Sequence, residues 1–339
     1  MMIDWREGGH VMDNSGGERY QDKQQIFGGE RRPLSASEVN AHLRTKWLGH
    51  HLLCYSEVDS TNQMAKICIA RQEPRGTVIV AETQTAGRGR LLRQWVSHPG
   101  VGLWFSVILS PFVPPNAALL SFLAGVSVCR VIREVTGLAA ELKWPNDVLI
   151  GDRKVCGILL EVGSDGESVV VGIGLNVNQQ RDEFPVALQD RATSLALEAG
   201  HPFDRPFLLA AILNAIENRV ETFLNEGSAA LMDEYRSLCT TIGKRVRIDF
   251  PDGTEEYGVV SGIADNGAVV FIPDVAGGGG AANQAGGVAV AAVADAAVAA
   301  GVAGGADSAA AKGARAAANA QARTREIMAG DITHLRTHN

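Results

Sequence analysis

The sequence predicts an α+β protein whose main sheet is mixed and mostly antiparallel, followed by a small C-terminal β-barrel. In residues 34–240, strand patterns precede one long amphipathic helix, and more strands follow that helix. After residue 241 the strands become short and alternating, with tight turns between them, as in small barrels. A chain of 339 residues with 46% hydrophobic and 20% charged residues has ample core and is not a disordered chain.

The N-terminal part begins without periodicity. Residues 1–33 are polar and rich in glycine, so we expect a disordered lead. A short helix is expected next: Ser35 or Ser37 can cap it, and Glu38 follows Ser35 at the spacing of a capping box. Residues 50–55 are apolar enough for a strand, and a turn at 59–61 leads into a helix over 62–71.

The central part alternates strands and helices. Residues 77–81 form a β-branched run that is typical of a buried strand, and a polar loop with several glycines follows over 83–100. A helix is expected from 114–116 to about Gly137 because prolines precede it and a glycine ends it. The other expected elements are strands at 102–109, 141–144, 148–162 with a turn at 151–153, and 168–176, and helices at 204–226 and 228–238.

The C-terminal region, 241–339, contains an interruption. Strands are expected at 244–250, 256–262 and 268–272. Residues 275–322 contain no Leu, Ile, Phe, Tyr or Trp, so they bury too little apolar area to offset the entropy of ordering. We therefore interpret them as a low-complexity insertion in a hairpin, after which the strand pattern resumes at Arg325.

Charge and cysteine content exclude several classes of protein. A net charge of −7 argues against a dedicated nucleic-acid binder. The five cysteines show no metal-binding spacing and favour reduced thiols in the cytoplasm. No signal peptide is evident, and residues 288–305 lack the large apolar side chains of a membrane span.

An arginine-rich loop is the first candidate for chemistry. The run Gly87–Arg90 is followed by Arg93 and Trp95, so three guanidiniums fall within six residues. Arginine binds carboxylate and phosphate through paired hydrogen bonds, and glycine lets a loop approach a ligand closely. The alternatives are a solvated basic turn or a contact to single-stranded nucleic acid.

Each of the next two candidate motifs begins with or contains a lysine in an unusual position. Lys143 opens the run KWPND (143–147), in which Asn146 can read an amide or a base edge; the alternative is an ordinary turn. Lys154 begins an otherwise apolar strand, and Gly157 three residues later leaves room for a ligand. The alternative for Lys154 is an edge lysine that reaches water.

The last two candidate motifs are a group of neutral polar residues and a strand that contains two glycines. Ser60, Thr61, Asn62 and Gln84 can donate and accept hydrogen bonds, which suits a neutral polar ring; alternatively, Ser60 only caps a helix. Residues 172–178 (GIGLNVN) look like half of a dinucleotide fingerprint. They lack its third glycine and its helix, so a Rossmann site is excluded.

Taken together and in this order, the five motifs resemble those of biotin–protein ligases (biotin–acetyl-CoA-carboxylase ligases). The resemblance covers residues 34–272 and 325–336. It implies a catalytic domain over 34–240 similar to class II synthetases and biotinyl/lipoyl ligases, and an SH3-like domain over 241–339. It also implies that ATP and biotin, with Mg²⁺, form biotinyl-5′-AMP, and that the biotinyl group passes to a lysine of a biotin carboxyl carrier protein domain.

The resemblance also assigns roles to individual residues. Lys154 and Arg88 would be catalytic, and no residue of this chain is assigned to a metal. The residues expected at biotin are Ser60, Thr61, Asn62, Gln84, Arg88, Gly89, Arg90, Lys154 and Gly157, and those expected at ATP are Arg90, Arg93, Trp95, Lys143, Asn146 and Asn176.

Some features depart from the family pattern. Leu91 and Leu92 stand where relatives often carry Arg-Arg-Gly, which removes a cation from the loop. Residues 1–50 lack the length and periodicity of a DNA-binding domain, so a monofunctional enzyme without a DNA partner is expected. The alternatives are a lipoate–protein ligase-like acyltransferase and a non-catalytic biotin or nucleotide-binding module. The sequence leaves open the carrier and the oligomeric state, including a homodimer.

Overall fold

The computed structural model describes residues 31–90, 93–109, 119–250, 252–274, 324–327 and 331–334. Most of the expected N-terminal lead, Leu91 and Leu92, and the expected insertion at 275–322 lie outside these residues. Within the described part of the chain, no helix combines the length and the apolar character that a membrane crossing requires.

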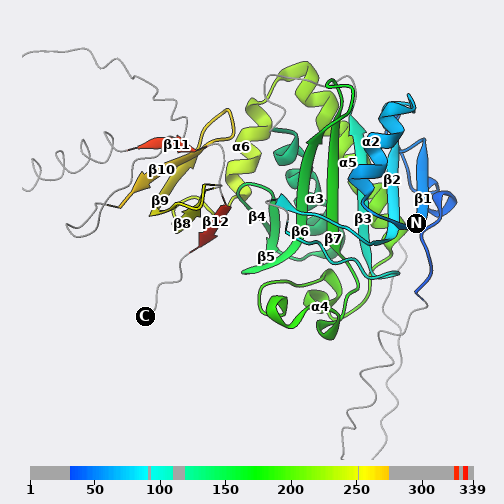
Figure 1. The fold of residues 1–339 in the computed structure, drawn as a ribbon, viewed down its shortest axis with the longest axis horizontal. Helices are drawn as coiled ribbons and strands as arrows, with labels where there is room; N and C mark the ends of the chain where they lie inside the picture. Colours follow the sequence, from blue (N-terminus) through cyan, green and yellow to red (C-terminus); the bar gives the residue numbers. More distant parts are fainter. Residues whose placement is uncertain are drawn as a thin grey trace, which may run out of the picture. The chain divides into compact units, whose positions relative to one another are not determined.

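A seven-stranded sheet forms the centre of the fold (Figure 1). Its strand order is β1-β2-β3-β7-β6-β5-β4, and only the pair β1–β2 is parallel. The expected mixed, mostly antiparallel sheet is therefore confirmed. The strands are β1 (Leu52–Val58), β2 (Val78–Gln84), β3 (Gly102–Leu109), β4 (Ala140–Lys143), β5 (Asp147–Ile150), β6 (Arg153–Val162) and β7 (Val169–Asn176).

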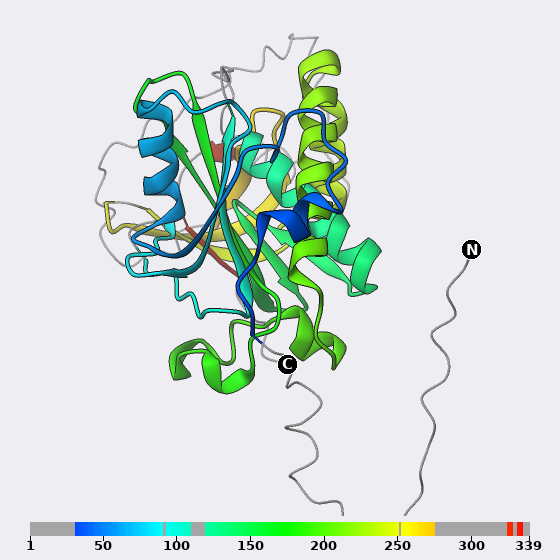
Figure 2. The same ribbon diagram turned by 90° about the vertical axis from the view of Figure 1, so that its right-hand side faces the viewer.

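Helices cover both faces of this sheet (Figure 2). Strand residues alternate between two apolar clusters: Val78 and Val80 face the cluster of α3 and α5, whereas Ile79 faces that of α2. This is the two-residue period of a strand that is buried on both faces. The helices are α1 (Ala36–Asn40), α2 (Thr61–Ala70), α3 (Leu119–Thr136), α4 (Leu195–Ala199), α5 (Arg205–Glu226) and α6 (Ala229–Leu238), with 3₁₀ turns η2 (Arg181–Glu183) and η3 (Val186–Leu188).

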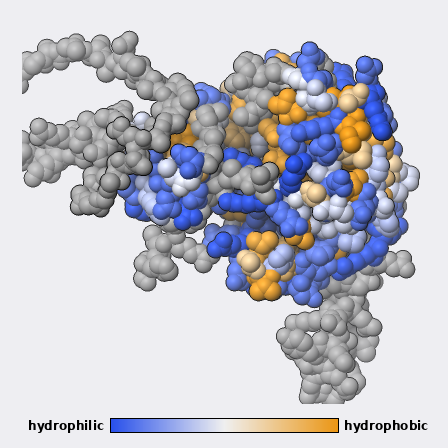
Figure 3. Space-filling view, in the orientation of Figure 1, coloured by the Kyte–Doolittle hydropathy of each residue, from blue (hydrophilic) through white to orange (hydrophobic). Residues whose placement is uncertain are grey.

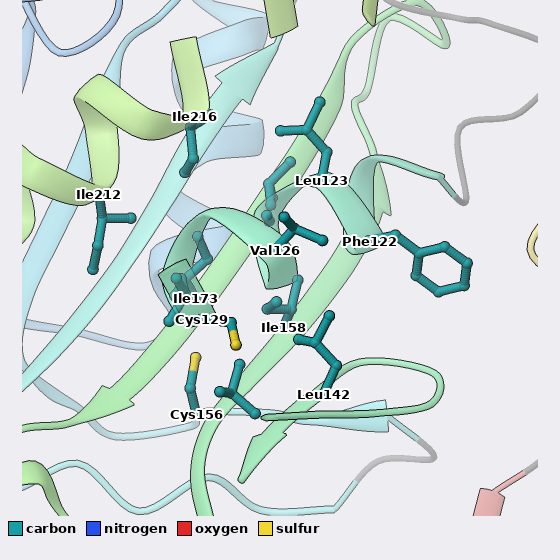
Figure 4. Packing of buried hydrophobic residues seen from close by; sticks show 14 of the residues in the cluster. Phe122, Leu123, Val126, Cys129, Leu142, Cys156, Ile158, Ile173, Ile212 and Ile216 are labelled. Atoms are coloured by element: carbon teal, nitrogen blue, oxygen red, sulfur yellow. The ribbon is translucent and has the colours of Figure 1, made fainter. Parts of the chain in front are cut away.

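The larger apolar cluster is centred on α3. Figure 4 shows Val126 and Cys129 of α3 beside Ile158 of β6, with Ile212 of α5 on the other side. Burial raises the pKa of the Cys129 thiol to about 11, so this thiol stays protonated at neutral pH. All five cysteines are free thiols.

A second, antiparallel sheet lies in the C-terminal part, with the order β11-β10-β9-β8-β12. Its closure into an SH3-like barrel and the domain boundary at 240/241 stay predictions. Trp144 reaches this part: its indole nitrogen donates to the carbonyl of Gly267 at 2.9 Å. The strands are β8 (Arg245–Asp249), β9 (Glu255–Ile263), β10 (Val269–Pro273), β11 (Arg325–Ile327) and β12 (Asp331–His334).

Most expected elements are found within a few residues of their predicted bounds. The predicted cap of α1 is present, since the Ser35 hydroxyl accepts a hydrogen bond from the backbone N–H of Glu38. The strand expected at 50–55 instead occupies Leu52–Val58, where it pairs with β2. The short helix α4 and both 3₁₀ turns were not predicted, because so few residues carry no periodic signal. On the surface, hydrophilic residues are interspersed with small hydrophobic patches (Figure 3).

Candidate active site

The arginine-rich loop folds back on itself as a hairpin. The backbone N–H of Gly89 donates to Arg93 O at 2.7 Å, and that of Trp95 donates to Gly87 O at 2.9 Å. Arg88 and Gln94 face each other as an antiparallel bridge between these two contacts. Arg88 and Arg93 are exposed and Arg90 is half-buried, so the loop presents cationic side chains at its surface.

Trp95 anchors this hairpin on the sheet. Gly157 of β6 and Gly174 of β7 are cross-strand partners, and the indole lies over both. A Cβ atom added at Gly174 would lie 2.5 Å from the indole, and one at Gly157 would lie 2.9 Å from it. Two paired glycines therefore make the space that Trp95 occupies. Its ring also meets that of Trp104 edge to face, with 6.0 Å between centroids.

Lys154 lies at the edge of the same glycine pair. Its Nζ is 2.5 Å from Asp147 Oδ1 and 5.3 Å from the centroid of the Trp95 ring. A Cβ at Gly157 would lie 2.9 Å from this Nζ. Strand β6 lies between β5 and β7, so Lys154 is not the edge-strand lysine of the alternative interpretation.

Cys156, two residues after Lys154, takes no part as a nucleophile. Burial raises the pKa of its thiol far above the ordinary value, and the nearby Lys154 charge only partly opposes this effect. A thiol that stays protonated is a poor nucleophile. Lys154 is therefore the candidate for chemistry on this strand.

The neutral polar set gathers where α2 begins and β2 ends. The Thr61 backbone N–H donates to Gln84 Oε1 at 2.9 Å, and Thr61 Oγ1 lies 2.7 Å from Ser106 Oγ. Asn62 faces away from Gln84, because its Oδ1 lies 2.6 Å from Ser106 Oγ and its Nδ2 lies 2.8 Å from Glu161 Oε2. Ser60 is the N-cap residue of α2 but makes no side-chain capping bond, contrary to the capping alternative.

The residues expected at the nucleotide outside the arginine-rich loop are Lys143 at the end of β4, Asn146 in the turn before β5, and Asn176 at the end of β7. Asn146 Nδ2 donates to Ile158 O at 2.6 Å, which ties the 143–147 turn to β6. Asn176 is buried, and its Nδ2 donates to Thr193 O at 2.9 Å. Lys143 ends β4 opposite Asp147, the partner of Lys154. The turn therefore borders Lys154, while the amide donors of both asparagines bind protein carbonyls.

Sequence reasoning missed two members of this arrangement, Ser106 and Glu161. Ser106 is fully buried in the apolar run of β3, and Glu161 lies near the end of β6. A polar residue inside an apolar strand is a signal that a buried partner exists. The sequence does not say which residue that partner is, because Ser106 and Thr61 are 45 positions apart.

Comparison with known proteins identifies related chains. Residues 55–178 match the biotin/lipoate A/B protein ligase family. The bifunctional ligase/repressor BirA of Bacillus subtilis is 39% identical over 242 residues, which are 70% of this chain and 74% of that protein. The biotin–[acetyl-CoA-carboxylase] ligase of Paracoccus denitrificans is 32% identical over 64% of this chain and 92% of its own length.

A solved structure agrees with these relatives. The biotin protein ligase of Aquifex aeolicus, in complex with biotin and ATP, superposes with a TM-score of 0.60 at 33% identity. The match covers 66% of this chain and 92% of that one. The resemblance inferred from the five motifs is thereby confirmed, and this chain belongs to the biotin/lipoate A/B protein ligase family, with biotin–protein ligases as its relatives.

Proposed function

We propose that this protein is a biotin–protein ligase that joins biotin to a lysine of a biotin carboxyl carrier protein domain through biotinyl-5′-AMP. One observation carries the proposal: the loop that follows Gln84, at the end of the neutral polar set, places Trp95 over the glycine pair beside Lys154 of the same sheet. The polar set suits an uncharged polar ring, and the lysine suits the acid group at the other end of the same molecule.

The biotin ureido ring would lie against Ser60, Thr61 and Gln84. Such a ring needs donors and acceptors in matched positions, because each buried polar atom left unpaired is costly. Hydroxyl and amide groups supply both kinds. Asn62 would act through its neighbours, since both ends of its amide contact protein atoms.

The first reaction step joins biotin to ATP. A biotin carboxylate oxygen attacks the α-phosphorus, the bond from that phosphorus to the bridging oxygen breaks, and pyrophosphate leaves. Lys154 would neutralise the carboxylate and the α-phosphate as they approach, and Arg88 would hold the carboxylate in place. Gly89 lets the loop backbone approach biotin, while Arg90 and Arg93 would meet the phosphates.

The nucleotide would lie on the side of Lys143, Asn146 and Asn176, with Trp95 as an apolar wall. The anhydride reacts readily with water, so closure of the 83–100 loop would protect it. In the second step the amine of a carrier lysine attacks the biotinyl carbonyl carbon. The amide bond forms, the amine loses a proton, and AMP leaves.

Magnesium fits this scheme as part of the MgATP substrate. The described residues contain no group of three or more His, Cys, Asp or Glu side chains that could hold a metal ion. Asp147 is the carboxylate beside Lys154, and it is already paired with that lysine. Mg²⁺ commonly keeps several waters and binds through substrate phosphates, which matches so sparse a donor set.

The alternatives predict different ligands. Lipoate carries an apolar dithiolane ring, which offers no hydrogen-bond acceptor to the amide nitrogen of Gln84. A storage module does not need cations for phosphates, so the set of Arg88, Lys143 and Lys154 argues against it. Five free thiols agree with the cytoplasm as the compartment.

The test is the mass of a carrier domain after incubation with the protein, MgATP and either biotin or lipoate. The proposal expects the mass of one biotinyl group, and no addition when the acceptor lysine is changed to arginine. Lipoyl attachment at a comparable rate would favour the lipoate alternative, and tight biotin binding without any modification would favour the storage module.

A further inference from the structure

A chain of hydrogen bonds runs from the expected biotin pocket to a carboxylate on β6. It links Thr61 Oγ1, Ser106 Oγ and Asn62 Oδ1 at 2.7 and 2.6 Å, and Asn62 Nδ2 then meets Glu161 Oε2 at 2.8 Å. Thr61, Ser106 and Asn62 are at most 4% exposed, so water does not compete for these bonds. Lys66 holds the other oxygen of Glu161 at 3.1 Å.

The carboxylate fixes the orientation of the Asn62 amide. An ionised carboxylate only accepts hydrogen bonds, so the Asn62 atom that faces Glu161 is the nitrogen. The same nitrogen lies 3.4 Å from the carbonyl of Leu159, which is also only an acceptor. The amide oxygen of Asn62 must therefore point to Ser106.

This orientation decides where each hydroxyl proton goes. Ser106 has one proton and gives it to Asn62 Oδ1, which only accepts. At the 2.7 Å contact between Ser106 and Thr61, Thr61 must therefore be the donor, although its Oγ1 also lies 3.2 Å from a second acceptor, Gln84 Oε1. Because its proton is used there, Thr61 Oγ1 can offer only a lone pair to a ligand.

Gln84 supplies a hydrogen-bond donor beside the acceptor of Thr61. Its Oε1 accepts from the Thr61 backbone N–H, so its Nε2 is directed elsewhere and remains a donor. A ligand in this pocket thus meets an acceptor at Thr61 and a donor at Gln84. A cyclic urea presents both a ring N–H and a carbonyl, and it satisfies both groups.

We propose that Glu161, through Asn62 and Ser106, makes Thr61 an obligatory acceptor and so selects ligands with a ring N–H at that position. The inference rests on the proposed function and deepens it. Glu161, Asn62 and Ser106 are positioning residues that act through Thr61. Gly172 provides the space for this arrangement, because a Cβ there would lie 2.2 Å from Asn62 Oδ1.

The test compares biotin with its two cyclic carbamate isomers, in each of which one ureido N–H is replaced by oxygen. Calorimetry of the full chain gives the dissociation constants. The wild type should bind biotin roughly 10- to 100-fold more tightly than one of the isomers. In that isomer a ring oxygen faces the lone pair of Thr61 Oγ1, so two acceptors meet without a proton between them.

Glu161→Gln should reduce this preference to within about threefold while preserving the fold. The amide oxygen of the glutamine would accept from Lys66, so its amide nitrogen would face Asn62. Asn62 would then rotate its amide so that its oxygen accepts from the glutamine and its nitrogen faces Ser106. Ser106 would accept from Asn62 and donate to Thr61. The Thr61 proton, no longer held by Ser106, would then be shared between Gln84 Oε1 at 3.2 Å and the ligand. Ser106→Ala should weaken the preference in the same way, because it removes the hydroxyl that links Thr61 to Asn62.

Ser127→Ala is the matched control, since Ser127 is equally buried and its hydroxyl donates to Leu123 O within α3, apart from the Thr61–Glu161 hydrogen bonds. It should keep the wild-type preference, and ATP binding should be unchanged in all variants. A preference that persists in Glu161→Gln and Ser106→Ala, or its absence in the wild type, overturns the inference. Failure of the wild type to bind biotin at all would overturn the proposed function.

Discussion

Lys154 is the residue on which the proposed chemistry depends most. A lysine at the start of an apolar strand gains little from packing, and its charge is costly to desolvate without an anion. In the structure Asp147 supplies that anion at 2.5 Å. During catalysis the biotin carboxylate and the α-phosphate would compete for the same ammonium group.

Lys154→Ala should lower the rate of adenylate formation by roughly 10²–10³, because one preorganised electrostatic contact is lost. Lys154→Met should be equally inactive, since it restores bulk without charge. The measurement is steady-state pyrophosphate release, with thermal unfolding to follow the fold. Lys244→Ala, an exposed lysine before β8, is the control. Turnover within a few-fold of wild type in both variants would remove Lys154 from the mechanism.

The glycine pair under Trp95 makes a second prediction. Gly174→Ala places a methyl group 2.5 Å from the indole, so Trp95 and its loop must shift. Adenylate formation should fall by at least about tenfold, and tryptophan fluorescence should change. Gly262→Ala in β9 is the control, because a Cβ there meets nothing. An unchanged rate in Gly174→Ala would show that adenylate formation does not require Trp95 to pack on the glycine pair.

At the scale of residues, the sequence indicates which single residues are unusual, but it does not indicate which residues they contact. Lys154 and Gly157 stand out as a charge and a gap in an apolar run. Glu161 does not, because its partner Asn62 is 99 positions away and lies on another element. Only the folded sheet brings the two together.

At the scale of elements, a buried ion pair ties α5 to the sheet. Arg205, the first residue of α5, donates to Glu82 of β2 at 2.9 Å, and both side chains are only 7% exposed. Glu82 also accepts from the backbone N–H groups of Leu34 and Gly100 at 2.6 and 2.8 Å. One carboxylate thus joins three segments that lie far apart in the sequence.

Glu82→Gln should lower the free energy of unfolding by about 3 kcal/mol, because it leaves the Arg205 charge buried without its partner. Chemical denaturation measures the change. Glu221→Gln breaks the exposed pair with Lys46 and should cost less than about 1 kcal/mol. Equal losses in the two variants would contradict the difference that burial is expected to make.

Long elements were predicted from their periodicity, and short ones only where a cap or an alternating pattern marked them, as at α1. Strand β3 has its predicted bounds, because its eight residues form a mostly apolar, buried run. Helix α4 has five residues and no period to detect. The strand order was also beyond the sequence, since β3 pairs with β7 across a helix and three intervening strands.

At the scale of the whole molecule, the C-terminal sheet is assembled from two separated stretches. Strand β11 pairs with β10, with Val269 opposite Ile327, although the expected insertion lies between them in sequence. The sequence predicted that the strand pattern resumes at Arg325. It did not predict β12 beside β8, because a strand of four residues gives no indication of its neighbour.

Deletion of residues 276–321 should leave adenylate formation within about twofold of wild type. The deleted residues contain no large apolar side chain, and the remaining chain is long enough to join β10 to β11. Trapped adenylate and thermal unfolding would be measured together. A folded deletion variant that forms no adenylate would show that this segment takes part in the reaction.

The central claim is that this chain activates biotin with ATP, and ATP–pyrophosphate exchange tests it without any carrier protein. Labelled pyrophosphate should enter ATP when biotin is present, and should not when biotin is omitted or replaced by lipoate. In Lys154→Ala the exchange should fall by roughly 10²–10³. Exchange that does not require biotin, or no exchange by the folded wild-type protein, would contradict the account.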